Sequence, residues 1–146
     1  MLKSILAVVV AFIAMAIFSF AAFTCAYLCL GVDRVFEPES YDVSMLWMVV
    51  MVVLGLIGGV VGGFVCAAIS KSMGVCKVFA VIVLVLGLLS AIVTTMKERP
   101  DTARSGDVPN LQAMQMAQTP IWLCLLNPVL GAVGVLLGAR KKLPAA

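Results

Sequence analysis

Four long stretches without a charged side chain constrain this chain more than any other feature. Ser4 to Val32 is the longest, with 29 uncharged residues, and Val43 to Ser70, Val78 to Met96 and Pro120 to Ala139 follow it. About 20 apolar residues suffice to cross a hydrocarbon core roughly 30 Å thick. Inside lipid, each backbone N–H and C=O must be paired within its own segment, so such stretches form helices. We predict an all-α integral membrane protein, a single domain over residues 1–146, with transmembrane helices at about 4–30, 44–70, 77–96 and 120–139.

The composition supports a membrane protein and excludes several classes of function. Hydrophobic residues make up 64% of the chain and charged residues 12%, about half the charge of a soluble domain. The 10 Lys and Arg lie apart rather than in a stripe, which argues against nucleic-acid binding. There is no His, and no Asp, Glu, Lys or Arg falls within a transmembrane stretch. We expect no cofactor, no metal and no catalytic residue, and we expect membrane lipid as one partner.

The charged residues divide unequally between the two sides of the membrane. If the N-terminus is inside, the inner side holds six Lys and Arg and no acid, whereas the outer loops, residues 31–43 and 97–119, hold four bases and all seven acids. Short basic loops stay in the cytoplasm, so we expect both termini there, in a bacterial plasma (inner) membrane. A cleavable signal peptide ending near Ala21 is the alternative for the first stretch. The apolar run continues to Leu30, which favours a retained helix.

Local signals place the ends of the predicted helices. Ser44 is a suitable N-cap for the second transmembrane helix, and Thr119 followed by Pro120 has the same role for the fourth. The link between the second and third helices is short, and Gly74 in it is suited to a left-handed turn. The short link therefore predicts that helices two and three run antiparallel. We expect the four helices to form two antiparallel hairpins, helices one and two followed by helices three and four.

Aromatic residues lie near the outer ends of the predicted helices. Trp47 and Trp122 each come three residues after the expected cap, and with Tyr41 they are candidate anchors in the headgroup layer. Tyr41 and Phe36 belong to a loop, residues 33–42, that has four acids against one base. We expect this loop to be solvated. Docking of its exposed aromatics to a basic partner is an alternative, and cation binding is another, although the spacing does not match an EF-hand.

The second outer loop and the cysteines carry weaker signals. Asn110 resembles a helix N-cap, and the segment that follows, up to Gln118, predicts a short helix lying on the membrane or on another subunit before the fourth span. A lid over a pocket is the functional alternative for this helix. None of the five cysteines forms a CxxC motif, and cysteine in a membrane helix is mostly a small apolar residue. A disulfide between Cys29 and Cys124 remains possible.

Glycines dominate one side of the second predicted helix. Five of them form two adjacent rows at four-residue spacing, and three more occur in the fourth helix. A strip without side chains lets another backbone approach closely, which drives helix association in lipid. The strip could pack on the chain's own fourth helix, on another chain, or line a permeation path. The candidate packing residues are Gly55, Gly58, Gly59, Gly62, Gly63, Gly131, Gly134 and Gly138.

The same glycines suggest a possible internal repeat. If one residue is inserted after the tryptophan, Gly55 superposes on Gly131, and the two glycines that follow in each helix also match. The two hairpins would then be parallel copies related by an axis along the membrane normal. Chance recurrence is the alternative, since glycine is common in membrane helices.

Asn127 and Pro128 interrupt the fourth predicted helix. Proline removes a backbone hydrogen bond and favours a kink. Asn127 is the only carboxamide within the predicted spans, so we expect it to make a polar contact, with Ser90 or Thr94 of the third helix. A structural hinge is one interpretation of this pair, and a polar element of a solute site is the other.

Three functions follow from these features. The leading hypothesis is a non-catalytic small membrane subunit that packs through its glycine-rich faces in a larger complex or a homo-oligomer. The second is a passive channel or small-solute facilitator formed by oligomerisation and lined by Asn127, Ser90, Thr94 and Thr95. The third is a membrane enzyme acting on lipid, in which acids of the first outer loop would converge with Lys97 or Arg99.

Overall fold

The computed structural model describes residues 2–96 and 108–143 and contains four long apolar helices. The chain is an all-α membrane protein with four spans, as the uncharged stretches predict. Each span is longer than the 20 or so residues needed to cross the hydrocarbon core. Two short helices, α2 and α5, complete the described part. The elements are α1 (Leu2–Leu30), α2 (Val32–Val35), α3 (Met45–Ser70), α4 (Met73–Thr95), α5 (Asn110–Met116) and α6 (Ile121–Lys142).

The helix ends agree with the sequence in one case and differ in three. Ser44 caps α3, and its hydroxyl accepts a hydrogen bond of 3.2 Å from the Trp47 backbone N–H. The N-cap of α6 is Pro120 rather than Thr119, and it makes no side-chain bond. The left-handed residue after α3 is Lys71, with φ 52°, whereas Gly74 lies inside α4.

The third difference concerns α5, whose N-cap is Pro109 rather than Asn110. Asn110 is the first residue of the helix, and its amide donates a hydrogen bond of 3.0 Å to the Thr24 hydroxyl of α1. The short helix predicted before the fourth span therefore exists. The side chain of Asn110 bonds to α1 and does not cap the N-terminus of α5.

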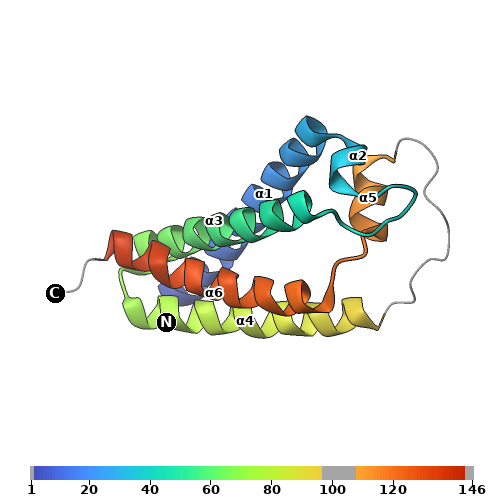
Figure 1. Ribbon diagram of the computed structural model, residues 1–146. Helices are drawn as coiled ribbons and strands as arrows, with labels where there is room; N and C mark the ends of the chain where they lie inside the picture. The colour runs from blue at the N-terminus through green and yellow to red at the C-terminus, as the bar shows by residue number, and fades with distance from the viewer. Residues whose placement is uncertain (1, 97–107, 144–146) are drawn as a thin grey trace.

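The two central helices of the bundle are α3 and α6, which pack closely along most of their length. On the outside, α1 packs mainly on α3, and α4 packs mainly on α6 (Figure 1). Contacts between α1 and α4 are few, and these two helices diverge toward the ends that lie near α2 and α5. Because α3 and α6 enter from the same end, they run parallel to each other.

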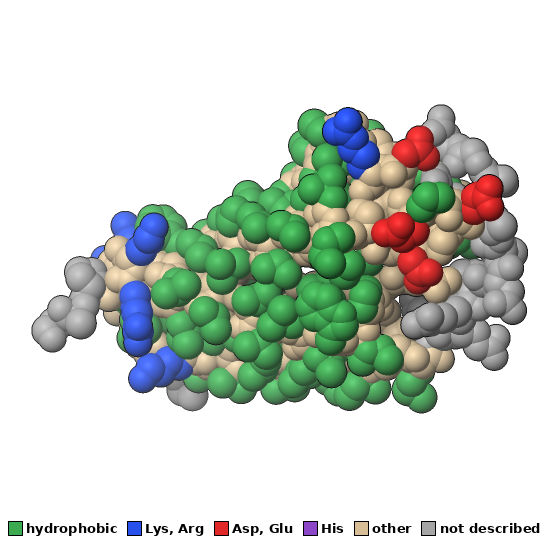
Figure 2. All heavy atoms as spheres, in the orientation of Figure 1, with side chains coloured by type: hydrophobic (Ala, Val, Ile, Leu, Met, Phe, Trp, Pro, Cys, Tyr) green, Lys and Arg blue, Asp and Glu red, His purple; other side chains and the backbone are tan. Residues whose placement is uncertain are grey.

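Charge separates the two ends of the described bundle (Figure 2). The end near the C-terminus, here called the basic end, carries Lys and Arg only. The opposite end, here called the cap end, carries the described acids, all of which are exposed, together with Arg34. On the face that Figure 2 shows, apolar side chains cover most of the surface between the two ends. Described residues at the basic end are Lys3, Lys71, Lys77, Arg140, Lys141 and Lys142, and the acids at the cap end are Asp33, Glu37, Glu39 and Asp42.

The loop between α1 and α3 folds into an ordered cap. Backbone bonds join it to the segment before α6: Val43 donates to Gln118 O at 3.2 Å, and Gln118 donates to Tyr41 O at 2.8 Å. Phe36 and Tyr41 point inward, 2% and 7% exposed, and their rings meet edge to face at 5.9 Å. The expectation that these two aromatics are exposed is therefore wrong, because the cap encloses its own apolar core and leaves the acids in solvent.

Candidate ligand cleft between α1 and α4

The tight contact between α3 and α6 is made by glycines. An added Cβ on Gly134 would lie 2.5 Å from Leu56 O and 2.9 Å from Gly59 Cα, closer than real Cβ atoms come to backbone. An added Cβ on Gly63 would overlap the backbone of Val135 in the same way, and one on Gly138 the backbone of Val60. We call the surface formed by Gly59, Gly63, Gly134 and Gly138 the glycine seam. The structure thus brings these four candidate packing residues together within one chain.

The contacts of the glycine seam are reciprocal. Gly59 faces the carbonyl of the residue three before Gly134, and Gly134 faces the carbonyl of the residue three before Gly59. The same relation holds between Gly63 and Gly138. The two glycines of each pair are 75 positions apart in the sequence, and so are the two tryptophans. The two helices therefore align on each other along the seam without an inserted residue. The register suggested by superposing Gly55 on Gly131 is off by one residue.

The outer helices break this symmetry. Gly58 and Gly62 of α3 are buried against α1, where an added Cβ on Gly58 would lie 2.9 Å from Ser19 Oγ. The residues 75 positions later, Val133 and Leu137, are each 44% exposed. Gly62 also faces α4, because an added Cβ there would lie 3.3 Å from the Phe79 ring. Both outer helices therefore lie on the same side of the seam, and repeat symmetry extends no further than α3 and α6.

A cleft of about 510 Å³ results between α1 and α4, and we call it the central cleft. Its volume lies within the range of small-molecule sites, roughly 300–1,000 Å³. The floor is formed by glycines of α3 and α6. An added Cβ on Gly55 would meet only Asn127 Oδ1, at an ordinary contact distance of 3.7 Å, whereas one on Gly131 would press on a methyl group of Val83 at 3.3 Å. Polar atoms reach the cleft from Ser19, Ser90, Thr94, Thr119 and Asn127.

Asn127 lines this cleft but does not make the predicted polar contact with Ser90 or Thr94. Its Oδ1 is buried and accepts no hydrogen bond from the residues that the structure describes. The Thr94 hydroxyl donates to the Ser90 carbonyl of its own helix at 2.9 Å, so the expected contact to α4 is not made. A buried acceptor without a donor costs about 1–3 kcal/mol. The neighbouring Pro128 instead packs on Gly87, where an added Cβ would lie 2.7 Å from its ring.

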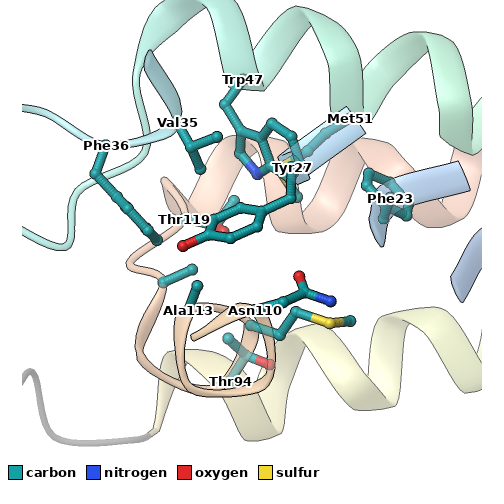
Figure 3. A pocket seen from close by; sticks show the side chains of 12 residues that line it. Phe23, Tyr27, Val35, Phe36, Trp47, Met51, Thr94, Asn110, Ala113 and Thr119 are labelled. Atoms are coloured by element: carbon teal, nitrogen blue, oxygen red, sulfur yellow. The ribbon is translucent and has the colours of Figure 1, made fainter. Parts of the chain in front are cut away.

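A second, smaller cavity of about 260 Å³ lies under the cap, and we call it the cap pocket. It shares Met51, Thr94 and Thr119 with the central cleft. Figure 3 shows Tyr27 crossing it between Trp47 and the short helix α5. The Tyr27 hydroxyl donates to Val108 O at 2.5 Å, which fastens the segment before α5 to α1. The two cavities meet at these shared residues, and α5 lines the cap pocket but not the central cleft.

The expected interfacial anchors have different environments. Trp122 is 56% exposed, in keeping with an anchor facing the headgroups. Trp47 is only 9% exposed and packs between Phe23 and Tyr27, with ring centroids 6.0 and 6.4 Å away. Tyr41 is buried within the cap. Thus one of the three candidates presents its side chain to the surroundings, and the other two build the core near the cap pocket.

The remaining candidate chemistry does not converge in the described part of the chain. Cys29 and Cys124 are free thiols, as are the other three cysteines, so the possible disulfide is absent. Residues 2–96 and 108–143 contain no group of three or more His, Cys, Asp or Glu able to hold a metal ion. Thr95 does not line the central cleft, and its hydroxyl donates to Ile92 O at 2.8 Å. Lys97 and Arg99 lie outside the described residues.

Sequence reasoning named Ser90 and Thr94 of α4 but missed the cleft residues of α1 and Gly87 of α4. Ser19, Phe12 and Met15 of α1 form one wall, and Gly87 of α4 receives the proline ring of α6. The only signal for Gly87 in the sequence is that it is an isolated glycine within an apolar stretch. Pro128, within another apolar stretch, is a residue whose ring such a glycine can accommodate. Nothing in a uniformly apolar α1 indicates which of its faces meets the rest of the bundle.

Comparison with known proteins adds no relative: no family model, curated protein or solved structure matches this chain.

Proposed function

We propose that this chain is a non-catalytic membrane protein that binds an apolar ligand, taken from the lipid phase, in the central cleft. The observation that carries the proposal is the cleft itself, about 510 Å³ between four spans, bounded by glycines on its floor. Binding sites for small molecules are concave and mostly apolar, with a few polar groups that fix orientation. Because α1 and α4 make few contacts, a ligand can enter sideways from the bilayer without crossing water.

A pair of glycine variants tests this proposal. Gly55→Leu places a side chain in the cleft where only Asn127 Oδ1 is near, whereas Gly74→Leu makes the same chemical change at an exposed position at the basic end. The probe is a photoactivatable long-chain methyl ether in phosphatidylcholine vesicles, with labelled peptides identified by mass spectrometry. Labelling of cleft peptides should fall severalfold in Gly55→Leu and stay at the wild-type value in Gly74→Leu. Equal labelling in the two variants would contradict the proposal.

The accessory-subunit hypothesis is a second candidate, and the exposed acidic surface of the cap favours it. Asp33, Glu37, Glu39 and Asp42 all face outward around buried aromatics, with Arg34 as the only described base beside them. Such a surface would complement a basic face of another membrane protein or of a second copy. Because the glycine seam is occupied within the chain, a partner would contact the cap or the exposed face of α1 instead. Mild-detergent extraction followed by sizing tests this candidate, and a lone monomer would contradict it.

We further propose a bacterial inner-membrane location with both termini cytoplasmic. The support is the separation of charge between the basic end and the cap end, since Lys and Arg are retained on the cytoplasmic side. Reporter fusions at the C-terminus and in the loop that contains Glu39 test the orientation. A reporter active only in the cytoplasm should work at the first position and fail at the second, and the reverse result would overturn the orientation.

A further inference from the structure

The chemistry of the central cleft narrows the class of ligand that it can hold. We infer that the ligand is an uncharged, membrane-soluble alcohol whose hydroxyl group donates a hydrogen bond to Asn127 Oδ1. This inference rests on the proposed function, since it requires the cleft to be a ligand site, and it adds the ligand's polar group and the residue that recognises it.

The first step is the state of the carboxamide. Asn127 lines the cleft, and its buried Oδ1 has no hydrogen-bond donor among the described residues. Two other cleft residues that could donate bond to backbone carbonyls instead: the Thr94 hydroxyl to Ser90 O at 2.9 Å, and the Cys124 thiol to Thr119 O at 3.8 Å. The protein therefore presents an acceptor to the cleft, and a ligand that brings an O–H group satisfies it.

The second step is the absence of countercharge in the cleft wall. Among residues 2–96 and 108–143, none of those that line the central cleft or the cap pocket is an Asp, Glu, Lys or Arg. A carboxylate or phosphate at Asn127 would be desolvated without a paired charge, which is strongly unfavourable within a bilayer. A hydroxyl group carries no such penalty, and because it both donates and accepts, it can bond to either end of the carboxamide.

The third step is the depth and shape of the site. Asn127 lies six residues into α6, about 9 Å from its cap end at 1.5 Å per residue, so the polar group lies within the membrane-spanning helix. Beyond it, toward the basic end, the cleft is walled by Phe12, Met15 and Val83. A molecule with one hydroxyl on a long apolar body matches this order of polar and apolar surface.

The experiment compares two probes on the intact protein in phosphatidylcholine vesicles: a photoactivatable long-chain alcohol and its methyl ether of equal length. The ether keeps the oxygen acceptor and lacks the donor. We expect the alcohol to label cleft peptides about tenfold more strongly at equal concentration, the ratio that corresponds to one net hydrogen bond. In Asn127→Leu the two probes should label equally. In Thr95→Val, which changes a hydroxyl outside the cleft, the preference should remain.

The outcomes separate this inference from the proposed function. Equal labelling by alcohol and ether in the wild-type protein overturns the inference and leaves the ligand cleft intact, and this comparison needs no variant to fold. A preference for the alcohol that persists in Asn127→Leu also overturns it. Labelling insensitive to Gly55→Leu overturns the proposed function as well. Competition with an unlabelled diacylglycerol or an unlabelled isoprenoid alcohol then distinguishes two natural sources of the same hydroxyl chemistry.

Discussion

Replacing Gly134 with alanine should destabilise the bundle far more than the same change at Gly55. An added Cβ on Gly134 meets Leu56 O at 2.5 Å, Gly59 Cα at 2.9 Å and Val60 N at 3.0 Å, all of them backbone atoms that cannot rotate away. Ordinary contact begins at 3.4 Å, so α3 and α6 must separate by about 0.9 Å, the difference between 3.4 and 2.5 Å. A gap of this size forfeits a quarter to a half of each dispersion contact along the seam.

The magnitude follows from comparing the two variants. Overpacking a well-packed contact costs about 1–3 kcal/mol. Both changes are glycine to alanine inside a helix, so the gain in helix propensity, up to about 1 kcal/mol, cancels in the difference. At Gly55 the nearest atom to an added Cβ is Asn127 Oδ1 at 3.7 Å, which is ordinary contact. Gly134→Ala should therefore have a free energy of unfolding about 2 kcal/mol below that of Gly55→Ala.

Unfolding in mixed micelles with increasing SDS, followed by far-ultraviolet circular dichroism, measures this difference. Gly55→Ala should match or slightly exceed the wild-type protein, because helix propensity improves and nothing is displaced. If Gly134→Ala is as stable as Gly55→Ala, the glycine seam is not the closest contact of the bundle, and the reasoning about α3 and α6 fails.

Two further predictions concern the cap end. Ser44→Ala should lower the free energy of unfolding by about 1 kcal/mol, because it removes the bond to the Trp47 N–H, whereas Ser72→Ala should change it little, since the Ser72 N-cap makes no side-chain bond. Unfolding in SDS measures both, and equal effects would contradict the capping assignment. Brominated lipids should quench the fluorescence of Trp122 much more than that of Trp47, because the two side chains are 56% and 9% exposed. Single Trp→Phe variants isolate each signal, and similar quenching of both would show that Trp47 is not enclosed.

The sequence predicts the spans well, because a bilayer leaves few alternatives for a long uncharged stretch. Ser44 is likewise identified correctly, since its capping bond is local. Local rules fail where tertiary contacts compete. Lys71 takes the left-handed conformation that Gly74 is suited to, and Phe36 is buried because residues distant in sequence close the cap over it.

The candidate site is less predictable for a geometric reason. Glycine spacing shows that close packing occurs on α3, but it leaves open which row meets α6. The structure assigns Gly59 and Gly63 to α6, and Gly58 to α1. A cleft forms only because α1 and α4 lie on the same side of the seam, and apolar helices exposed to lipid carry little sequence signal for that choice. The sequence predicts a polar contact for Asn127, but the surroundings of its side chain depend on this arrangement.

Native mass spectrometry of the intact chain released from its own membrane tests the ligand cleft most directly. We expect the wild-type protein and Gly74→Leu to retain one small, uncharged, lipid-soluble molecule per chain, and we expect Gly55→Leu to lose it. The same molecule retained equally by Gly55→Leu, or no bound molecule in any of the three proteins, would contradict the central claim that the space between α1 and α4 is a binding site.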